Sequence, residues 1–145
     1  MLTEKDYCDH DTCVALKELG YKVPTSAYYM PHHKDLIWVS NPFRGGYVID
    51  CFYSHNSLSK DVMTANFIDA PTLWEAQKWL REEKNIYVEV TIVVSGKNYM
   101  FEIYDTETAM LKRFVEEDYS SYEEALLEGI KEAVKILKEE LNEET

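Results

Sequence analysis

Apolar residues recur at helical spacing towards the end of the chain. Between 121 and 141 they follow one another at intervals of three and four, which places them on one face of an α-helix. This stripe comprises Tyr122, Leu126, Ile130, Ala133, Leu137 and Leu141. Ser121 and Glu124 form an S-x-x-E capping box, whose hydroxyl and carboxylate satisfy backbone N–H groups that the first turn leaves unpaired. We therefore predict a capped amphipathic helix that is held by the packing of its stripe.

A second helix is predicted in the middle of the chain. Thr72 and Glu75 repeat the capping box directly after Pro71. The apolar stripe that follows comprises Leu73, Ala76, Trp79 and Leu80. Trp74 lies off this stripe, and we expect it to pack against another element; the alternative is an exposed aromatic side chain.

A shorter helix is predicted near the start of the chain. Asp9 is a residue type that accepts a hydrogen bond from the backbone of the first turn, and it therefore favours the N-cap position. The pattern continues to Leu19, and Gly20 follows at the place where a left-handed residue ends many helices. We expect the helix to begin after Asp9 and to end at Gly20.

Residues 86 to 104 alternate between apolar and mixed positions, which is the period of a β-strand. The apolar set of the first strand comprises Ile86, Val88, Val90, Ile92 and Val94. A turn at 95–98 precedes a second alternating segment with Tyr99, Phe101 and Ile103 on one face. The pattern predicts a hairpin, followed by a third strand at 110–115. We expect the flanking helices to cover the face that carries Ile86, Val88, Val90 and Ile92.

Together these elements indicate the α+β class, with an antiparallel meander packed by two or three helices in a small two-layer or α-β-α sandwich. A chain of 145 residues suits one compact domain, so we predict a single domain over 1–145. Residues 1–70 would contain a helix and irregular β structure, and residues 71–141 would contain helix, meander and helix. In the N-terminal half we expect strands at 27–30 and 36–39 to pair, and another strand at 47–53.

The composition is that of a globular protein with an acidic balance. Hydrophobic residues make up 46% of the chain, and 15 basic against 27 acidic residues give a net charge of −12. This balance argues against the basic surface that a phosphate-backbone binder needs, so direct nucleic-acid binding is not expected. The predicted terminal helix is rich in Glu, and we expect a solvated face. The alternative is an acidic surface that is aimed at a basic partner or imitates a nucleic-acid backbone.

No segment has the pattern of a signal peptide or a membrane anchor. Five acidic residues among the first twenty exclude a signal-peptide core, and the longest mostly apolar run, 90–94, is too short to span a bilayer. Three cysteines, Cys8, Cys13 and Cys51, are an odd number without a secretory signal. We therefore expect a cytoplasmic protein without membrane contact.

The groups that could carry chemistry do not fall into a dependable pattern. The candidate metal ligands are Cys8, His10, Cys13, His32, His33, Cys51 and His55. None has the tight C-x2-C or H-x3-H spacing of a zinc site, and Cys51-x3-His55 comes nearest. The same pair is also the nearest approach to a cysteine nucleophile with a histidine base. Buried cysteines that pack as small apolar residues are the preferred explanation, so we predict no metal and no cofactor.

Carboxylate pairs are abundant, mostly at predicted helix ends and turns. Glu89 and Glu102 are the exception, because we expect them to face each other across the hairpin, as a catalytic pair does. An exposed sheet face is the preferred explanation for them. We therefore predict no catalytic residue.

Three segments resemble a group of bacterial proteins. They are residues 70–83 (APTLWEAQKWLREE), residues 119–133 (YSSYEEALLEGIKEA) and residues 8–21, which end in LKELGY. The chain is similar there to small, uncharacterised bacterial proteins of phage and prophage-type regions. The resemblance implies an intracellular accessory protein, and it implies no catalytic residue.

We therefore expect a non-enzymatic accessory protein of phage or mobile-element type. It would act by protein–protein interaction, with a partner protein or a second copy, through its acidic α+β domain. The strand rich in Val and Ile would be a route to self-pairing if it lies at a sheet edge. The alternative is a small-ligand binder or enzyme that uses the aromatic-rich segment 28–55. Its candidate ligand-binding residues are Tyr28, Tyr29, Trp38, Arg44, Tyr47, Tyr53 and His55.

Overall fold

The structure is a computed structural model that describes residues 2–31, 34–43, 46–50, 67–94 and 96–143, with strand placement alone for 38–43 and 46–50. Its contacts divide the chain into two compact units, Tyr7–Pro71 and a unit formed by Met1–Asp6 with Thr72–Thr145. Each unit combines helical segments with antiparallel strands, which confirms the predicted α+β class. The single domain over 1–145 stays a prediction.

The unit Tyr7–Pro71 contains helix α1 (His10–Glu18) and a four-stranded sheet of order β3-β2-β1-β4. The strands are β1 (Ala27–Tyr29), β2 (Ile37–Phe43), β3 (Gly46–Asp50) and β4 (Ile68–Asp69). Strands β1 and β2 pair antiparallel, as predicted for 27–30 and 36–39. Strand β3 confirms the predicted strand at 47–53 as far as residue 50, and 51–53 lie outside the described residues.

Helix α1 begins and ends where the sequence predicts. The carboxylate of Asp9 accepts a hydrogen bond from the backbone N–H of Thr12 at 2.9 Å, which satisfies one donor of the first turn. Gly20 follows the helix with a φ of 100°, a conformation that a residue without a Cβ adopts at little cost. Both ends are therefore set by local chemistry.

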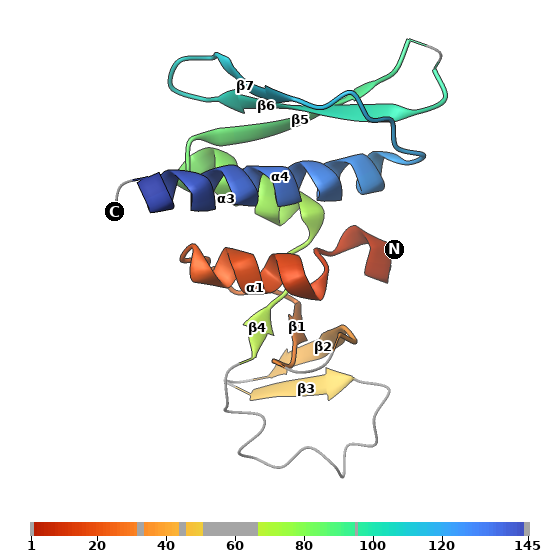
Figure 1. The fold of residues 1–145 in the computed structure, drawn as a ribbon. Coiled ribbons are helices and arrows are strands. Elements are labelled where there is room, and N and C mark those ends of the chain that lie inside the picture. The colour runs from red at the N-terminus through yellow and green to blue at the C-terminus, as the bar shows by residue number, and fades with distance from the viewer. Residues whose placement is uncertain (1, 32–33, 44–45, 51–66, 95, 144–145) are drawn as a thin grey trace. The chain divides into compact units, whose positions relative to one another are not determined.

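The second unit contains the predicted helix, meander and helix. Its elements are the 3-10 turn η1 (Glu4–Asp6), α3 (Leu73–Glu83), β5 (Ile86–Ile92), β6 (Tyr99–Asp105), β7 (Leu111–Phe114) and α4 (Tyr122–Glu143). The strands form an antiparallel sheet of order β5-β6-β7. Helices α3 and α4 lie on the same side of this sheet (Figure 1). None of the described helices combines the length and the apolar character that crossing a bilayer requires.

The two predicted capping boxes differ in the structure. The box at α3 is complete, because Glu75 N donates to Thr72 Oγ1 at 3.1 Å and Thr72 N donates to Glu75 Oε1 at 2.9 Å. At α4 the backbone N–H of Glu124 donates to Ser121 Oγ at 3.1 Å. The carboxylate of Glu124, however, accepts a hydrogen bond from Ser120 Oγ at 2.8 Å. The predicted return bond to the backbone of Ser121 is therefore replaced by a side-chain contact.

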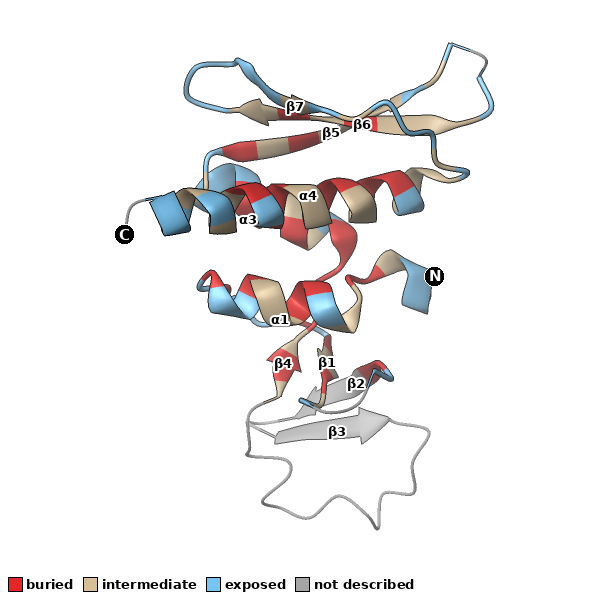
Figure 2. Cartoon of the chain, viewed as in Figure 1, coloured by how far each residue is buried: buried red, intermediate tan, exposed pale blue. Residues whose placement is uncertain are grey.

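The core of this unit lies between the helices and one face of the sheet (Figure 2). Its buried side chains include Ile86, Val88, Phe101, Ile103, Leu126 and Ile130. At Gly129 the backbone of α4 comes so close to the sheet that a Cβ there would lie 2.4 Å from Val88 Cγ1. A glycine at this point of the stripe thus lets the helix pack directly on the strands.

Three expectations about packing are wrong. Leu141, the last residue of the predicted stripe of α4, is 52% exposed. The helices do not cover Ile92 of the first strand as predicted, and its side chain is 59% exposed. The reason is that the end of the β5–β6 hairpin continues past the start of α4 (Figure 1). Trp74 is 39% exposed, because it lies off the buried stripe of α3.

Candidate functional site

Most of the predicted aromatic ligand-binding site falls where side chains are not described. Arg44, Tyr53 and His55 lie outside the described residues. Trp38 is placed in β2 and Tyr47 in β3, without a description of their side chains. The Cys51–His55 pair also lies outside the described residues, as do His32 and His33.

The two remaining candidates, Tyr28 and Tyr29, are neighbours on β1. The ring of Tyr28 lies 5.9 Å from the ring of Phe67, whereas Tyr29 is buried. Consecutive residues of a strand point to opposite faces of the sheet. The structure therefore does not bring these two rings together.

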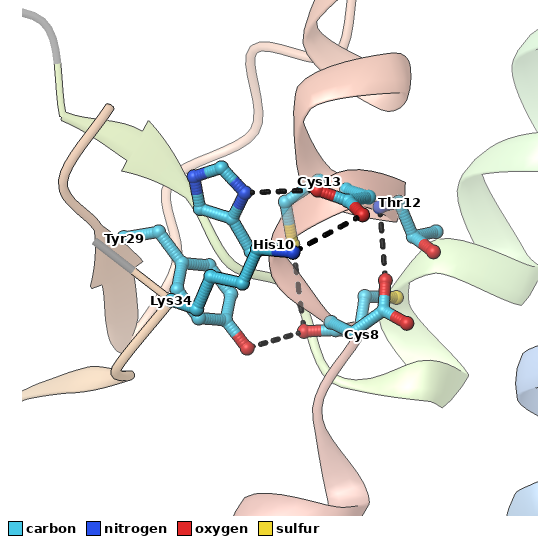
Figure 3. Close-up of polar contacts among 8 residues, drawn as sticks. Cys8, His10, Thr12, Cys13, Tyr29 and Lys34 are labelled. Carbon is cyan, nitrogen blue, oxygen red and sulfur yellow. Dashed lines mark hydrogen bonds and ion pairs between the residues drawn. The ribbon is translucent and has the colours of Figure 1, made fainter. Parts of the chain in front are cut away.

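Tyr29 instead belongs to a polar cluster around the backbone of Cys8 (Figure 3). The carbonyl oxygen of Cys8 accepts hydrogen bonds from Tyr29 Oη at 2.9 Å and from Cys13 Sγ at 3.6 Å. The ring of His10 meets that of Tyr29 edge-on, with 5.4 Å between the centroids. Nδ1 of His10 lies 3.2 Å from Asp11 Oδ1.

These contacts fix the start of α1. Cys8 and Cys13 are buried free thiols, and Cys13 donates a hydrogen bond to the carbonyl oxygen of Cys8. A nucleophilic cysteine needs an accessible thiolate beside a base, which this arrangement does not provide. Among the described residues, no three His, Cys, Asp or Glu side chains gather closely enough to hold a metal ion.

The most distinctive surface of the described residues is in the other unit, on the side of the β5-β6-β7 sheet opposite α3 and α4. We call it the outer face, and it comprises Glu89, Met100, Glu102, Tyr104, Leu111 and Phe114. The register places these side chains together, because residues directly opposite each other in an antiparallel sheet share a face. Glu89 pairs with Glu102, Glu102 with Phe114, and Tyr104 with Leu111.

Two carboxylates stand side by side in the middle of the outer face. Glu89 and Glu102 are direct partners in the register, which confirms that they face each other across the hairpin. The hydroxyl of Tyr104 donates to Glu102 Oε2. This hydrogen bond and the nearby charge of both carboxylates raise the pKa of Tyr104. Neither glutamate has an ion-pair partner within the described part of the chain.

Exposed apolar side chains lie beside the carboxylates. Leu111 is 52% exposed and Phe114 is 46% exposed. Both belong to β7, and a register shift between Ile103 and Tyr104 marks a bulge in its pairing with β6. The sequence analysis expected a strand here but did not identify this surface. Its signal was the pair of apolar residues on either side of Lys112-Arg113.

The bulge turns two consecutive cations towards α4. Arg113 pairs with Glu132, and its Nη2 lies 3.5 Å from Glu139 Oε2. Lys112 Nζ lies 2.5 Å from Glu140 Oε1. Three carboxylates of α4 are thus committed to ion pairs within the unit. This argues against imitation of a nucleic-acid backbone, which needs a row of free carboxylates.

Comparison with known proteins identifies no relative of this chain. No protein-family model matches the chain, and no curated protein or solved structure matches it.

Proposed function

We propose that this chain is a non-enzymatic accessory protein of phage or mobile-element type, which acts by binding another protein. We further propose that the outer face is the contact surface. The observation that carries the proposal is the pairing of exposed Leu111 and Phe114 with two facing carboxylates on the side of the sheet away from α3 and α4. Apolar side chains gathered on an exposed face are typical of protein–protein contact sites.

The carboxylate pair indicates the chemistry of the partner. Like charges directly opposite each other in a sheet repel, and Glu89 and Glu102 have no cation among the described residues to offset this. A Lys or Arg side chain placed between them by a partner would relieve the repulsion. The chain also carries a net charge of −12, which steers basic partners towards it. We therefore favour a partner segment in which a basic side chain is flanked by apolar ones.

The proposal is tested by capture of partner proteins from the native host with matched variants. Leu111→Ser removes an apolar side chain of the outer face, and Leu141→Ser removes one of equal exposure, 52%, at the end of α4. We expect wild type and Leu141→Ser to retain the same protein and Leu111→Ser to lose it, as measured by quantitative mass spectrometry. Equal recovery by the two variants, or no specific protein with wild type, would contradict the proposal.

The charge of the partner needs its own test. We expect the double variant Glu89→Gln/Glu102→Gln to bind the captured partner less tightly and with a weaker dependence on salt than wild type. Glu116→Gln/Glu143→Gln removes the same amount of charge at exposed positions outside the outer face and serves as the control. If both double variants change the dissociation constant equally, the partner responds to net charge and not to the outer face.

A further inference from the structure

Strand β5 forms an edge of the three-stranded sheet. The sequence analysis expected this strand, which is rich in Val and Ile, to allow self-pairing if it lay at such an edge. In an antiparallel ladder, alternate residues direct both backbone groups to the neighbouring strand and the residues between them direct both outward. Asn85 and Val93 bond across the hairpin, to Thr106 at 3.0 Å and to Asn98 at 2.8 Å. The residues of even number between them therefore direct their N–H and C=O groups away from β6.

The first half of this edge is closed by a side chain. Gln77 of α3 donates from Nε2 to the carbonyl oxygen of Val88 at 2.7 Å. The amide thus occupies an acceptor that another strand would need, which is a known protection of sheet edges. Registers that require the Val88 carbonyl are excluded as long as Gln77 holds it.

The second half of the edge is open. Within the described part of the chain, no donor or acceptor meets the outward N–H and C=O groups of Val90 and Ile92. The side chain of Ile92 is 59% exposed, and Val94 just beyond it is fully exposed. An edge with two free residue positions and exposed β-branched side chains is a template for strand addition.

We propose that a second copy of this chain pairs with β5 in antiparallel orientation, centred on Thr91. In this register Val90 lies opposite Ile92 of the second copy, and the reciprocal pair forms by symmetry. All the free backbone groups of Val90 and Ile92 are then satisfied. The two sheets join into one continuous sheet across the symmetry axis.

The side chains suit a partner of the same sequence. Val90 and Ile92 of the two copies would cover each other, and the two Thr91 side chains would form a cross-strand pair of a favourable type. Glu89 would lie opposite Val93 of the second copy, so no two carboxylates face each other across the new ladder. The inference extends the proposed function to a partner of the same sequence, on a strand edge and not on the outer face, so the two proposals can fail separately.

The first test is the oligomeric state of the full chain as a function of concentration, by sedimentation equilibrium. We expect a monomer–dimer equilibrium, and we expect Ile92→Lys to raise its dissociation constant by more than about tenfold, because Lys at an edge opposes strand addition. Leu111→Lys places the same residue at a position of similar exposure on β7 and should leave the constant unchanged. A monomer at every concentration overturns the proposal, as does loss of the dimer in Leu111→Lys alone.

The second test measures the register. Thr91→Cys would place two cysteines directly opposite each other at a non-hydrogen-bonded pair, with about 4.5 Å between Cα atoms, which a disulfide can bridge. We expect it to form a covalent dimer under mild oxidation faster than wild type. Glu89→Cys is the control, because it would lie opposite Val93 and not opposite itself. Equal rates for the two variants would rule out pairing centred on Thr91.

Discussion

The two faces of the β5-β6-β7 sheet are built by alternate residues of the same strands, yet they differ in almost every physical respect. On the inner face Val88 and Ile103 are fully buried against α3 and α4. On the outer face Glu89 and Glu102 face each other beside the exposed side chains of β7. Strand periodicity produces most of this division, because neighbouring residues of a strand point to opposite sides. The bulge in β7 then places both Leu111 and Phe114 on the outer face.

The comparison shows that adjacent residues of one strand serve different purposes: one contributes to the stability of the fold, and the next remains exposed for binding. Burial of the inner face supplies the hydrophobic stabilisation of this unit. The outer face keeps apolar side chains in contact with water, where they contribute little to folding and remain free to bind. Substitutions at neighbouring positions should therefore affect different properties.

The largest effect is expected from a cavity on the inner face. Ile103→Ala should lower the free energy of unfolding by about 2–5 kcal/mol, because it removes a fully buried side chain from a packed core. Phe114→Ala, on the outer face, should change it by less than about 1 kcal/mol. Urea unfolding midpoints measure both, and similar losses for the two variants would show that the outer face is part of the core.

A smaller effect is expected where α4 meets the inner face. Gly129→Ala should lower the free energy of unfolding by about 1–3 kcal/mol, because the added Cβ would lie 2.4 Å from Val88 Cγ1. This is opposite in sign to the preference of isolated helices for Ala over Gly.

The cause of that loss can be isolated with a double variant. Val88→Ala removes the methyl groups that the new Cβ would meet, so Gly129→Ala should cost less in the Val88→Ala background than in wild type. Lys135→Ala, at an exposed position of α4, is the control and should be nearly neutral. Additive losses from Gly129→Ala and Val88→Ala would show that helix and strand do not meet there.

The ion pairs that join β7 to α4 should contribute less than the core. Arg113→Met is expected to lower the free energy of unfolding by about 0.5–1 kcal/mol at low salt, because the pairs with Glu132 and Glu139 are partly exposed to solvent. High salt should reduce the difference from wild type. Lys97→Met, at an exposed position of the β5–β6 turn, tests for a general effect of charge.

The smallest effect is confined to alkaline pH. Burial, followed by a hydrogen bond to Glu117, raises the pKa of Tyr119 from 10 to about 12. Between these two values the unfolded chain releases a proton that the folded chain retains, so the free energy of unfolding falls as pH rises above about 10. Tyr119→Phe should remove this share of the decrease. At neutral pH it should have only the small effect of the lost hydrogen bond to Glu117. Absorbance of tyrosinate during titration gives the pKa directly.

The features that could be predicted from the sequence are those with a local cause. Asp9 sets the start of α1 through its carboxylate, and Gly20 follows the end of the helix with its positive φ. Thr72 and Glu75 cap the first turn of α3. The pairing of Glu89 with Glu102 also followed from alternation around a short turn. In each case the cause lies within a few residues or a single hairpin.

The remaining features depend on contacts between distant residues. Strand β4 has two residues and therefore no period to detect. The alternating pattern of the strand predicted that Ile92 would be buried. Its side chain is exposed because α4 begins further along the sheet, a contact that the sequence pattern does not reveal. The outer face needs the bulge in β7, which sends Lys112 and Arg113 to α4 and leaves Leu111 and Phe114 beside the carboxylates.

The single amide of Gln77 has a consequence for the size of any assembly. By closing part of β5, it leaves only a short stretch on which another chain can align, and a two-fold pair uses that stretch in both molecules at once. The opposite boundary, β7, has four residues, two of them cations held by α4. Growth of the β5-β6-β7 sheet by strand addition would then stop at two molecules.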